Sequence, residues 1–205
     1  MKYIDVDSWS RKRLYNHFMQ LQDPYFGVVV PFNVTRAFEF SKENNVSFFV
    51  KYLHDCMKAI NAVDNFRYRI IDDNIVDFEV IHASATIARE DNTYGFSFIN
   101  YSEDLEEFIS SFNKEKQRIQ SSDELYPPVN GQDCIHCSAL PWFQFSGHKE
   151  PSSGNIESIP ELAFSKFKKE GNQLIINVSI HVNHALIDGY HVGQFVEIFQ
   201  NNLNT

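Results

Sequence analysis

Short apolar runs alternate with longer amphipathic stretches along this chain of 205 residues. Runs rich in β-branched and aromatic residues and bounded by turn residues predict strands. The predicted strands cover residues 26–34, 66–71, 75–80, 83–88, 94–99, 134–140, 161–168 and 174–182. Apolar residues at helical spacing predict helices over residues 9–21, 47–60, 103–121 and 191–202. Helices scattered among neighbouring hairpins predict an α+β sandwich.

Polar residues mark the ends of several predicted elements. Ser8 and Ser102 each precede a predicted helix and are expected to cap it, because a serine hydroxyl accepts a hydrogen bond from the first helical turn. Ser47 opens the predicted helix 47–60. Residues 147–158 form the most loop-like stretch of the chain. The sequence has no internal repeat and no long linker, so residues 1–205 are expected to form a single domain.

Reactive side chains gather where the last predicted strand meets the last predicted helix. His184 and Asp188 lie four residues apart at this junction. A connecting turn that rigid elements hold is a common place for reactive groups. A histidine there can accept a proton near neutral pH, so His184 is the leading candidate for a general base. The alternative interpretation is a core histidine satisfied by a hydrogen bond.

Composition narrows the range of partners. The net charge of −9 argues against nucleic acid, which needs clustered lysine and arginine. The chain has no apolar run long enough to span a membrane, and its first residues have no apolar export region. We therefore expect a cytoplasmic protein. The 19 phenylalanines indicate a large packed interior or an aromatic pocket.

The three cysteines are expected to be free thiols, since disulfides are rare in cytoplasmic proteins. Cys134 and Cys137 have the C-x-x-C spacing of a zinc site. A zinc site needs about four ligands, and no second cysteine pair follows. The spacing therefore favours two strand cysteines, and we expect no metal.

The segment His184-x-x-x-Asp188-Gly189 resembles the signature of the chloramphenicol acetyltransferases. Other segments resemble elements of the same family and occur in the family's order along nearly the whole chain. These are Trp9-Ser-Arg11, Asn65-Phe66-Arg67, Ser138-Ala-Leu-Pro141-Trp142-Phe-Gln-Phe145, Ile159-Pro160, Phe164-Ser-Lys166-Phe167 and Glu170-Gly171. Together they are specific for the family, though not for its antibiotic substrate.

The resemblance implies a two-layer sandwich, in which helices cover one face of a mixed, largely antiparallel sheet. It also implies direct transfer of an acetyl group from acetyl-CoA, a co-substrate, to the hydroxyl of a small molecule, with no permanently bound cofactor. Chloramphenicol is the family's acceptor, and resistance to this antibiotic is the family's role. The family is a homotrimer with its active sites between subunits.

The resemblance also implies roles for individual residues. His184 would be the general base, and Asp188 would pair with Arg11 to hold the histidine in place. Phe18 and Phe96 match aromatic positions that line the acceptor pocket. Lys166 matches a basic position near the end of the CoA channel.

The chain departs from the family pattern at the oxyanion site. The family's oxyanion-binding serine falls on Gly147, so Ser146 or a backbone N–H would have to supply the donor. A family threonine that helps bind the transition state falls on Ala163, and a common second histidine falls on Asn183. Two alternatives therefore stay open. One is an acyltransferase for another hydroxyl acceptor, and the other is a catalytically weak relative that binds an apolar ligand.

Overall fold

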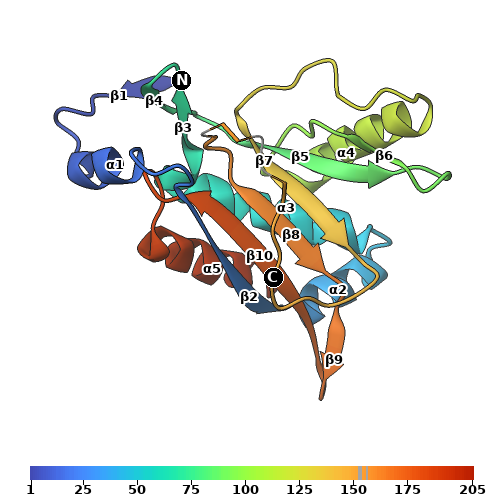
Figure 1. Ribbon diagram of the computed structural model, residues 1–205. Helices are drawn as coiled ribbons and strands as arrows, with labels where there is room; N and C mark the ends of the chain where they lie inside the picture. Colours follow the sequence, from blue (N-terminus) through green and yellow to red (C-terminus); the bar gives the residue numbers. More distant parts are fainter. Residues whose placement is uncertain (152–153, 156) are drawn as a thin grey trace.

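The computed structural model describes residues 1–151, 154–155 and 157–205 (Figure 1). Its helices are α1 (Lys12–Phe18), α2 (Thr35–Glu43), α3 (Phe48–Ala62), α4 (Leu105–Gln120) and α5 (Gly189–Leu203), with a 3₁₀ turn η1 (Asp64–Arg67). Its strands are β1 (Lys2–Ile4), β2 (Tyr25–Asn33), β3 (Tyr68–Ile71), β4 (Asn74–Asp77), β5 (His82–Ala88), β6 (Tyr94–Phe96), β7 (Cys134–Leu140), β8 (Glu161–Ser165), β9 (Lys168–Glu170) and β10 (Gln173–Asn183).

The main sheet has the strand order β2-β10-β8-β7-β5-β6, and β9 extends it by pairing with β10. The pairs β5–β7 and β7–β8 are parallel, and the other pairs are antiparallel. β10 lies between β2 on one side and β8 and β9 on the other. The predicted mixed, largely antiparallel sheet is confirmed.

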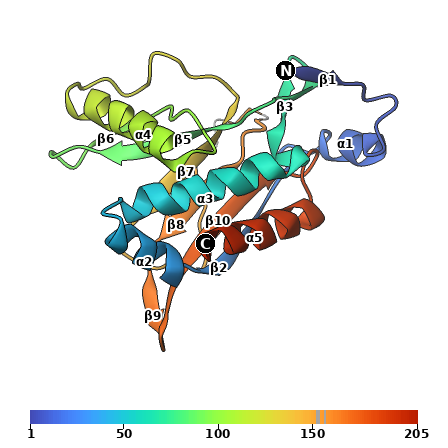
Figure 2. The same ribbon diagram turned by 180° about the vertical axis from the view of Figure 1, so that it is seen from behind.

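The helices α2, α3, α4 and α5 lie on one face of the main sheet, as the view from behind shows (Figure 2). Alternation along β10 explains this layering, because every second side chain points to the helices. Ile176, Val178, Ile180 and Val182 are buried in one apolar cluster together with residues of α5. The predicted two-layer α+β sandwich with helices on one face is therefore confirmed.

A smaller sheet, β1-β4-β3, stands beside the main one. Arg69 on β3 ties it to the rest of the fold, although no part of its side chain is exposed. Its guanidinium donates hydrogen bonds to the carbonyl oxygens of Phe66, Tyr68, Gln132 and Cys134. One side chain thus joins η1 and β3 to the start of β7.

Two predicted helix starts differ from the structure, and a third, at Ser47, is confirmed. Ser8 does not cap a helix, because its hydroxyl donates to Asp5 and α1 begins only at Lys12. α4 is capped by Asp104 rather than Ser102, since the Asp104 carboxylate accepts from two backbone N–H groups of the first turn. Ser47 occupies the N-cap position of α3, but its side chain makes no capping hydrogen bond.

Other element boundaries also differ. α2 was not predicted, because its apolar residues follow directly on those of β2. The predicted strand 161–168 is divided into β8 and β9. The predicted loop 147–158 contains Ser152, Ser153 and Ile156, which lie outside the described residues. In the described part of the chain, no helix is both long and apolar enough to cross a bilayer.

Candidate active site

Residues 183–188 connect β10 to α5, and we call them the histidine turn. The backbone N–H groups of Leu186 and Ile187 both donate to the carbonyl of Asn183, which closes the turn. Ala185, Leu186 and Ile187 are almost completely buried and anchor the turn in the core. The same packing leaves His184 half-buried at the surface of the core, where its backbone N–H donates to Pro24.

The imidazole of His184 lies between two aromatic rings. It stacks on Phe18 of α1 with a centroid distance of 3.9 Å and an interplanar angle of 8°. Phe26 of β2 contacts it at 4.5 Å. The Nδ1 atom is buried and has no hydrogen-bond partner among the described residues. The Nδ1 atom thus gives no support to the alternative interpretation, a core histidine satisfied by a hydrogen bond.

Arg11 and Asp188 form the predicted pair at the end of the histidine turn, with Arg11 Nη1 2.5 Å from Asp188 Oδ2. Asp188 is also the N-cap of α5, because its Oδ1 accepts from the backbone N–H of Tyr190. Burial alone would raise the pKa of Asp188, but the Arg11 hydrogen bond and the nearby charges of His191 and Arg11 lower that pKa below its usual value. The Nε and Nη2 atoms of Arg11 are buried and have no hydrogen-bond partner in the part of the chain that the structure describes. Such atoms are uncommon in folded proteins.

The structure places Ser146 and Phe96 away from His184 in the same chain. Ser146 is exposed and follows Phe145, whose carbonyl accepts a hydrogen bond from Asn177 of β10. Asn177 and His184 are seven residues apart, and seven strand residues span roughly 23 Å. Phe96 stacks on Tyr126 at 5.4 Å. It belongs to β6, at the opposite side of the molecule from α1 and the histidine turn (Figures 1 and 2).

Lys166 lines an aromatic cavity of about 360 Å³ near the start of α3. Its backbone N–H donates to Phe143, and its side chain is exposed. The other lining residues are Phe48, Phe49, Tyr52, Ala139, Pro141, Phe164, Ser165 and Phe167. The sequence did not reveal this cavity, because the aromatic residues of α3 have the helical spacing of ordinary core residues.

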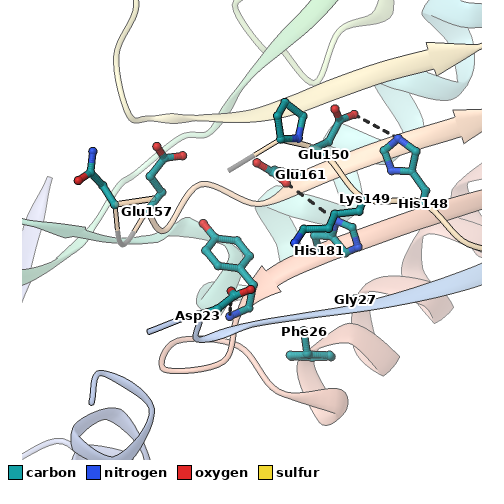
Figure 3. A pocket seen from close by; sticks show the side chains of 12 residues that line it. Asp23, Phe26, Gly27, His148, Lys149, Glu150, Glu157, Glu161 and His181 are labelled. Carbon is teal, nitrogen blue, oxygen red and sulfur yellow. Dashed lines mark hydrogen bonds and ion pairs between the residues drawn. The ribbon is translucent and has the colours of Figure 1, made fainter. Parts of the chain in front are cut away.

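A second cavity, of about 300 Å³, lies over the helix-free face of the sheet beside Tyr25 (Figure 3). His181 and Glu161 face each other there across β10 and β8, with His181 Nδ1 3.9 Å from Glu161 Oε2. Burial, together with the negative charges of Glu150 and Glu157, raises the pKa of Glu161 to about 7. Sequence analysis does not predict this pair, since only the register of β8 and β10 brings His181 and Glu161 together.

The cysteines that have the C-x-x-C spacing lie on β7. Cys134 and Cys137 are both buried and free. Burial raises the pKa of Cys134 to about 12 and raises that of Cys137 as well, so both are thiols at neutral pH. Among the described residues, no three His, Cys, Asp or Glu side chains are grouped so that they could hold a metal ion.

Comparison with known proteins identifies the family of this chain. The family described as Chloramphenicol acetyltransferase matches residues 1–200. The chain belongs to the chloramphenicol acetyltransferase family. A chloramphenicol acetyltransferase of Bacillus pumilus is 28% identical over 199 residues, which are 96% of this chain and 90% of that protein. Chloramphenicol acetyltransferase 2 of Escherichia coli is 25% identical and covers 96% of this chain and 94% of its own length.

Solved structures agree with the family assignment. A chloramphenicol acetyltransferase superposes with a TM-score of 0.87 and 25% identity, covering 98% of this chain and 99% of its own. A probable dihydrolipoamide acetyltransferase of Listeria monocytogenes has a TM-score of 0.67 at 12% identity, covering 99% of this chain and 93% of its own, and shares the fold alone. Membership of the chloramphenicol acetyltransferase family makes this chain an acetyltransferase, with the fold of the CoA-dependent acyltransferases.

Proposed function

We propose that this family member transfers an acetyl group from acetyl-CoA directly to the hydroxyl of a small molecule, with His184 as the general base. The observation that carries the proposal is the state of the His184 ring. It is held at a strand-to-helix turn and stacked on Phe18, and its buried Nδ1 has no hydrogen-bond partner among the described residues. A histidine without a structural partner remains available as a proton acceptor.

In the proposed reaction the acceptor hydroxyl gives its proton to Nε2 of His184 while its oxygen attacks the thioester carbonyl. The tetrahedral oxyanion then collapses, the carbon–sulfur bond breaks, and the CoA thiolate takes the proton from the imidazolium. Phe18 would contact the acceptor beside the ring. Asp188 and Arg11 would hold the end of the histidine turn so that the ring stays in place.

The cavity beside Lys166 suits acetyl-CoA. Aromatic rings line it, and such rings stack on a nucleotide base, while a lysine ammonium at the rim can pair with a phosphate. The buried, reduced thiols of Cys56, Cys134 and Cys137 are consistent with action in the cytoplasm.

We further propose that the active site forms between subunits of a homotrimer. Within one chain Phe96 lies on the opposite side of the molecule from the histidine turn, and Ser146 follows Phe145, which bonds to Asn177, seven residues before His184. A neighbouring subunit would bring both to the acceptor, with Ser146 as the donor to the oxyanion and Phe96 in the acceptor pocket.

Two residues bear on the identity of the acceptor. Gly147 has open space around its α-carbon, and Ala163 is buried on β8 beside Ser179 of β10. Neither residue supplies the hydroxyl that the family uses to bind the transition state. These two positions favour a hydroxyl acceptor other than chloramphenicol as the second candidate.

A thiol-release assay tests the reaction with acetyl-CoA and chloramphenicol, followed by a panel of other alcohols. We expect His184→Ala to reduce the rate at least about 10²-fold while the protein stays folded, since general base catalysis contributes on that scale. Release only with other alcohols would select the second candidate. No release with any acceptor from a folded protein would exclude the transferase activity.

Subunit mixing tests where the site lies. His184→Ala and Ser146→Ala subunits, each nearly inactive alone, are unfolded, mixed and refolded together. A site shared between chains regains activity wherever an intact His184 faces an intact Ser146. Mixed oligomers that stay inactive would show that both residues act within one chain. Full activity of Ser146→Ala alone would show that Ser146 has no role.

A further inference from the structure

Two asparagine side chains hold the peptide groups that follow His184. Asn183 is the last residue of β10, and only 1% of it is exposed. Its Oδ1 accepts from the backbone N–H of Ala185 at 2.9 Å, and its Nδ2 donates to the carbonyl of Glu157 at 2.8 Å. The oxygen of the Asn183 amide thus bonds to the backbone of the turn, and its nitrogen bonds to the backbone of Glu157.

Asn65 approaches the same turn from η1, which is 121 residues away in the sequence. Its Nδ2 donates to the carbonyl of Leu186 at 2.6 Å, and the contact is buried. The N–H of residue 185 and the carbonyl of residue 186 are thus fixed by different asparagines. His184 sits directly before these two fixed groups.

The second ring nitrogen of a functional histidine is often held by a hydrogen bond. A carboxylate or a carbonyl then accepts from this nitrogen and orients the ring. Here Nδ1 of His184 has no such partner among the described residues. The direction of the ring then depends on the backbone of the turn and on the stacking with Phe18.

We propose that Asn183 and Asn65 are positioning residues that set the direction of the His184 ring by fixing the backbone of the histidine turn. This inference rests on the proposed function, in which His184 is the base. The hydrogen bonds of both asparagines go to the main chain, so both act on the ring through the backbone of the turn. An oriented base is needed for rate, since a displacement of about 1 Å can cost on the order of 10²-fold.

The chain contains a matched control. Asn33 ends β2 just as Asn183 ends β10, and its Oδ1 accepts from the backbone N–H of Thr35 at 3.0 Å, again two residues further on. Asn33 pairs with Ile175 at the opposite end of the β2–β10 ladder from Asn183. Equal substitutions at the two asparagines break the same kind of bond, but only one of them lies beside His184.

The test compares Asn183→Ala and Asn33→Ala by steady-state kinetics in the thiol-release assay. We expect Asn183→Ala to lower kcat about 10- to 10²-fold while both KM values change less than about twofold, because an interaction that orients the base acts mainly in the transition state. Asn65→Ala should lower kcat in the same direction. Asn33→Ala should leave kcat unchanged. Asn183→Ser should recover most of kcat, since a serine hydroxyl can accept from the same N–H.

A readout without turnover separates this inference from the proposed function. The proton resonances of the His184 ring, assigned by their loss in His184→Ala, should shift in Asn183→Ala and Asn65→Ala and stay in place in Asn33→Ala. Shifted resonances in a protein that never releases CoA would uphold the positioning role and overturn the base. Unchanged resonances and kcat in Asn183→Ala would overturn the positioning role. An equal loss of kcat in Asn183→Ala and Asn33→Ala would also overturn it, since it would mark a general loss of structure.

Discussion

The β2–β10 ladder ends in a strand-to-helix turn at each end, and the two turns differ in one respect that matters. At one end Asn33 closes β2 and α2 begins two residues later, at Thr35. At the other end Asn183 closes β10 and α5 begins only at Gly189. Both asparagines bond to the N–H two residues further on. The same local device thus supports a short connection at one end and, at the other, a longer turn that presents His184.

The side chains that hold the two turns in place differ in charge. Gln200 holds the Asn33 turn with two neutral hydrogen bonds to the backbone of Asn33. The histidine turn ends in an ion pair between Arg11 and Asp188, whose side chains are 14% and 25% exposed. Neutral hydrogen bonds are enough to fix a connection. A partly buried ion pair adds a penalty for any rearrangement, because moving one partner leaves the other charge unpaired.

The largest expected difference in stability follows from removing the Arg11–Asp188 ion pair at one turn and the Gln200 hydrogen bonds at the other. Arg11→Ala or Asp188→Asn should lower the free energy of unfolding by about 2–4 kcal/mol, somewhat less than for a fully buried pair, and should lower kcat as well. Gln200→Ala should lower stability by about 1–2 kcal/mol, the value of two neutral hydrogen bonds, and leave kcat unchanged. Urea unfolding and thiol release measure both quantities. Unchanged stability in Arg11→Ala and Asp188→Asn would remove the structural role of the pair.

The second difference is a dependence on pH. The pKa of Asp188 is lowered in the folded state, so its stabilising effect is present above the unfolded value of about 3.9 and is lost as the pH falls through the lower folded value. The melting temperatures of wild type and Asp188→Asn should therefore differ fully at pH 6 and converge below about pH 4. The deficit of Asn33→Ala, which involves no titrating group, should stay constant. A deficit of Asp188→Asn that persists at low pH would show that its charge is not what stabilises the turn.

The smallest expected effect concerns the aromatic contact. Phe18→Ala removes the ring that stacks on His184, and such contacts are worth about 0.5–1.5 kcal/mol. We expect a rise of up to about tenfold in the KM of the acceptor and a modest fall in kcat. Phe40→Ala, at the half-buried ring of α2 beside Lys51, is the matched control and should change neither constant. Equal kinetics for Phe18→Ala and wild type would exclude Phe18 from the acceptor site.

The sequence predicted the strands better than the helix ends. The run that became β10 was placed over residues 174–182 and is observed as Gln173–Asn183, because β-branched residues in series have few alternatives to a strand. The start of α4 was misplaced because Ser102 and Asp104 are both good caps. The backbone conformation places Asp104, rather than Ser102, at the N-cap of α4.

The candidate site likewise contains one contact that was predictable and others that were not. The Arg11–Asp188 pair joins residues 177 positions apart, and only the family resemblance made it predictable. The resemblance carried no information on Asn65 as a partner of Leu186, nor on His181 as a neighbour of Glu161. Those contacts depend on strand register and on the packing of η1, which periodicity along one chain does not reveal.

Arg69 sets a limit on what the chain can tolerate at that position. Its three guanidinium nitrogens donate hydrogen bonds to four carbonyl oxygens, and among the described residues no carboxylate accepts from it. A lysine ammonium has its donors on one atom and cannot span that arrangement, although it would keep the charge. The anchoring of the small sheet thus depends on the planar shape of the guanidinium, and a swap that conserves charge would loosen it about as much as one that removes charge.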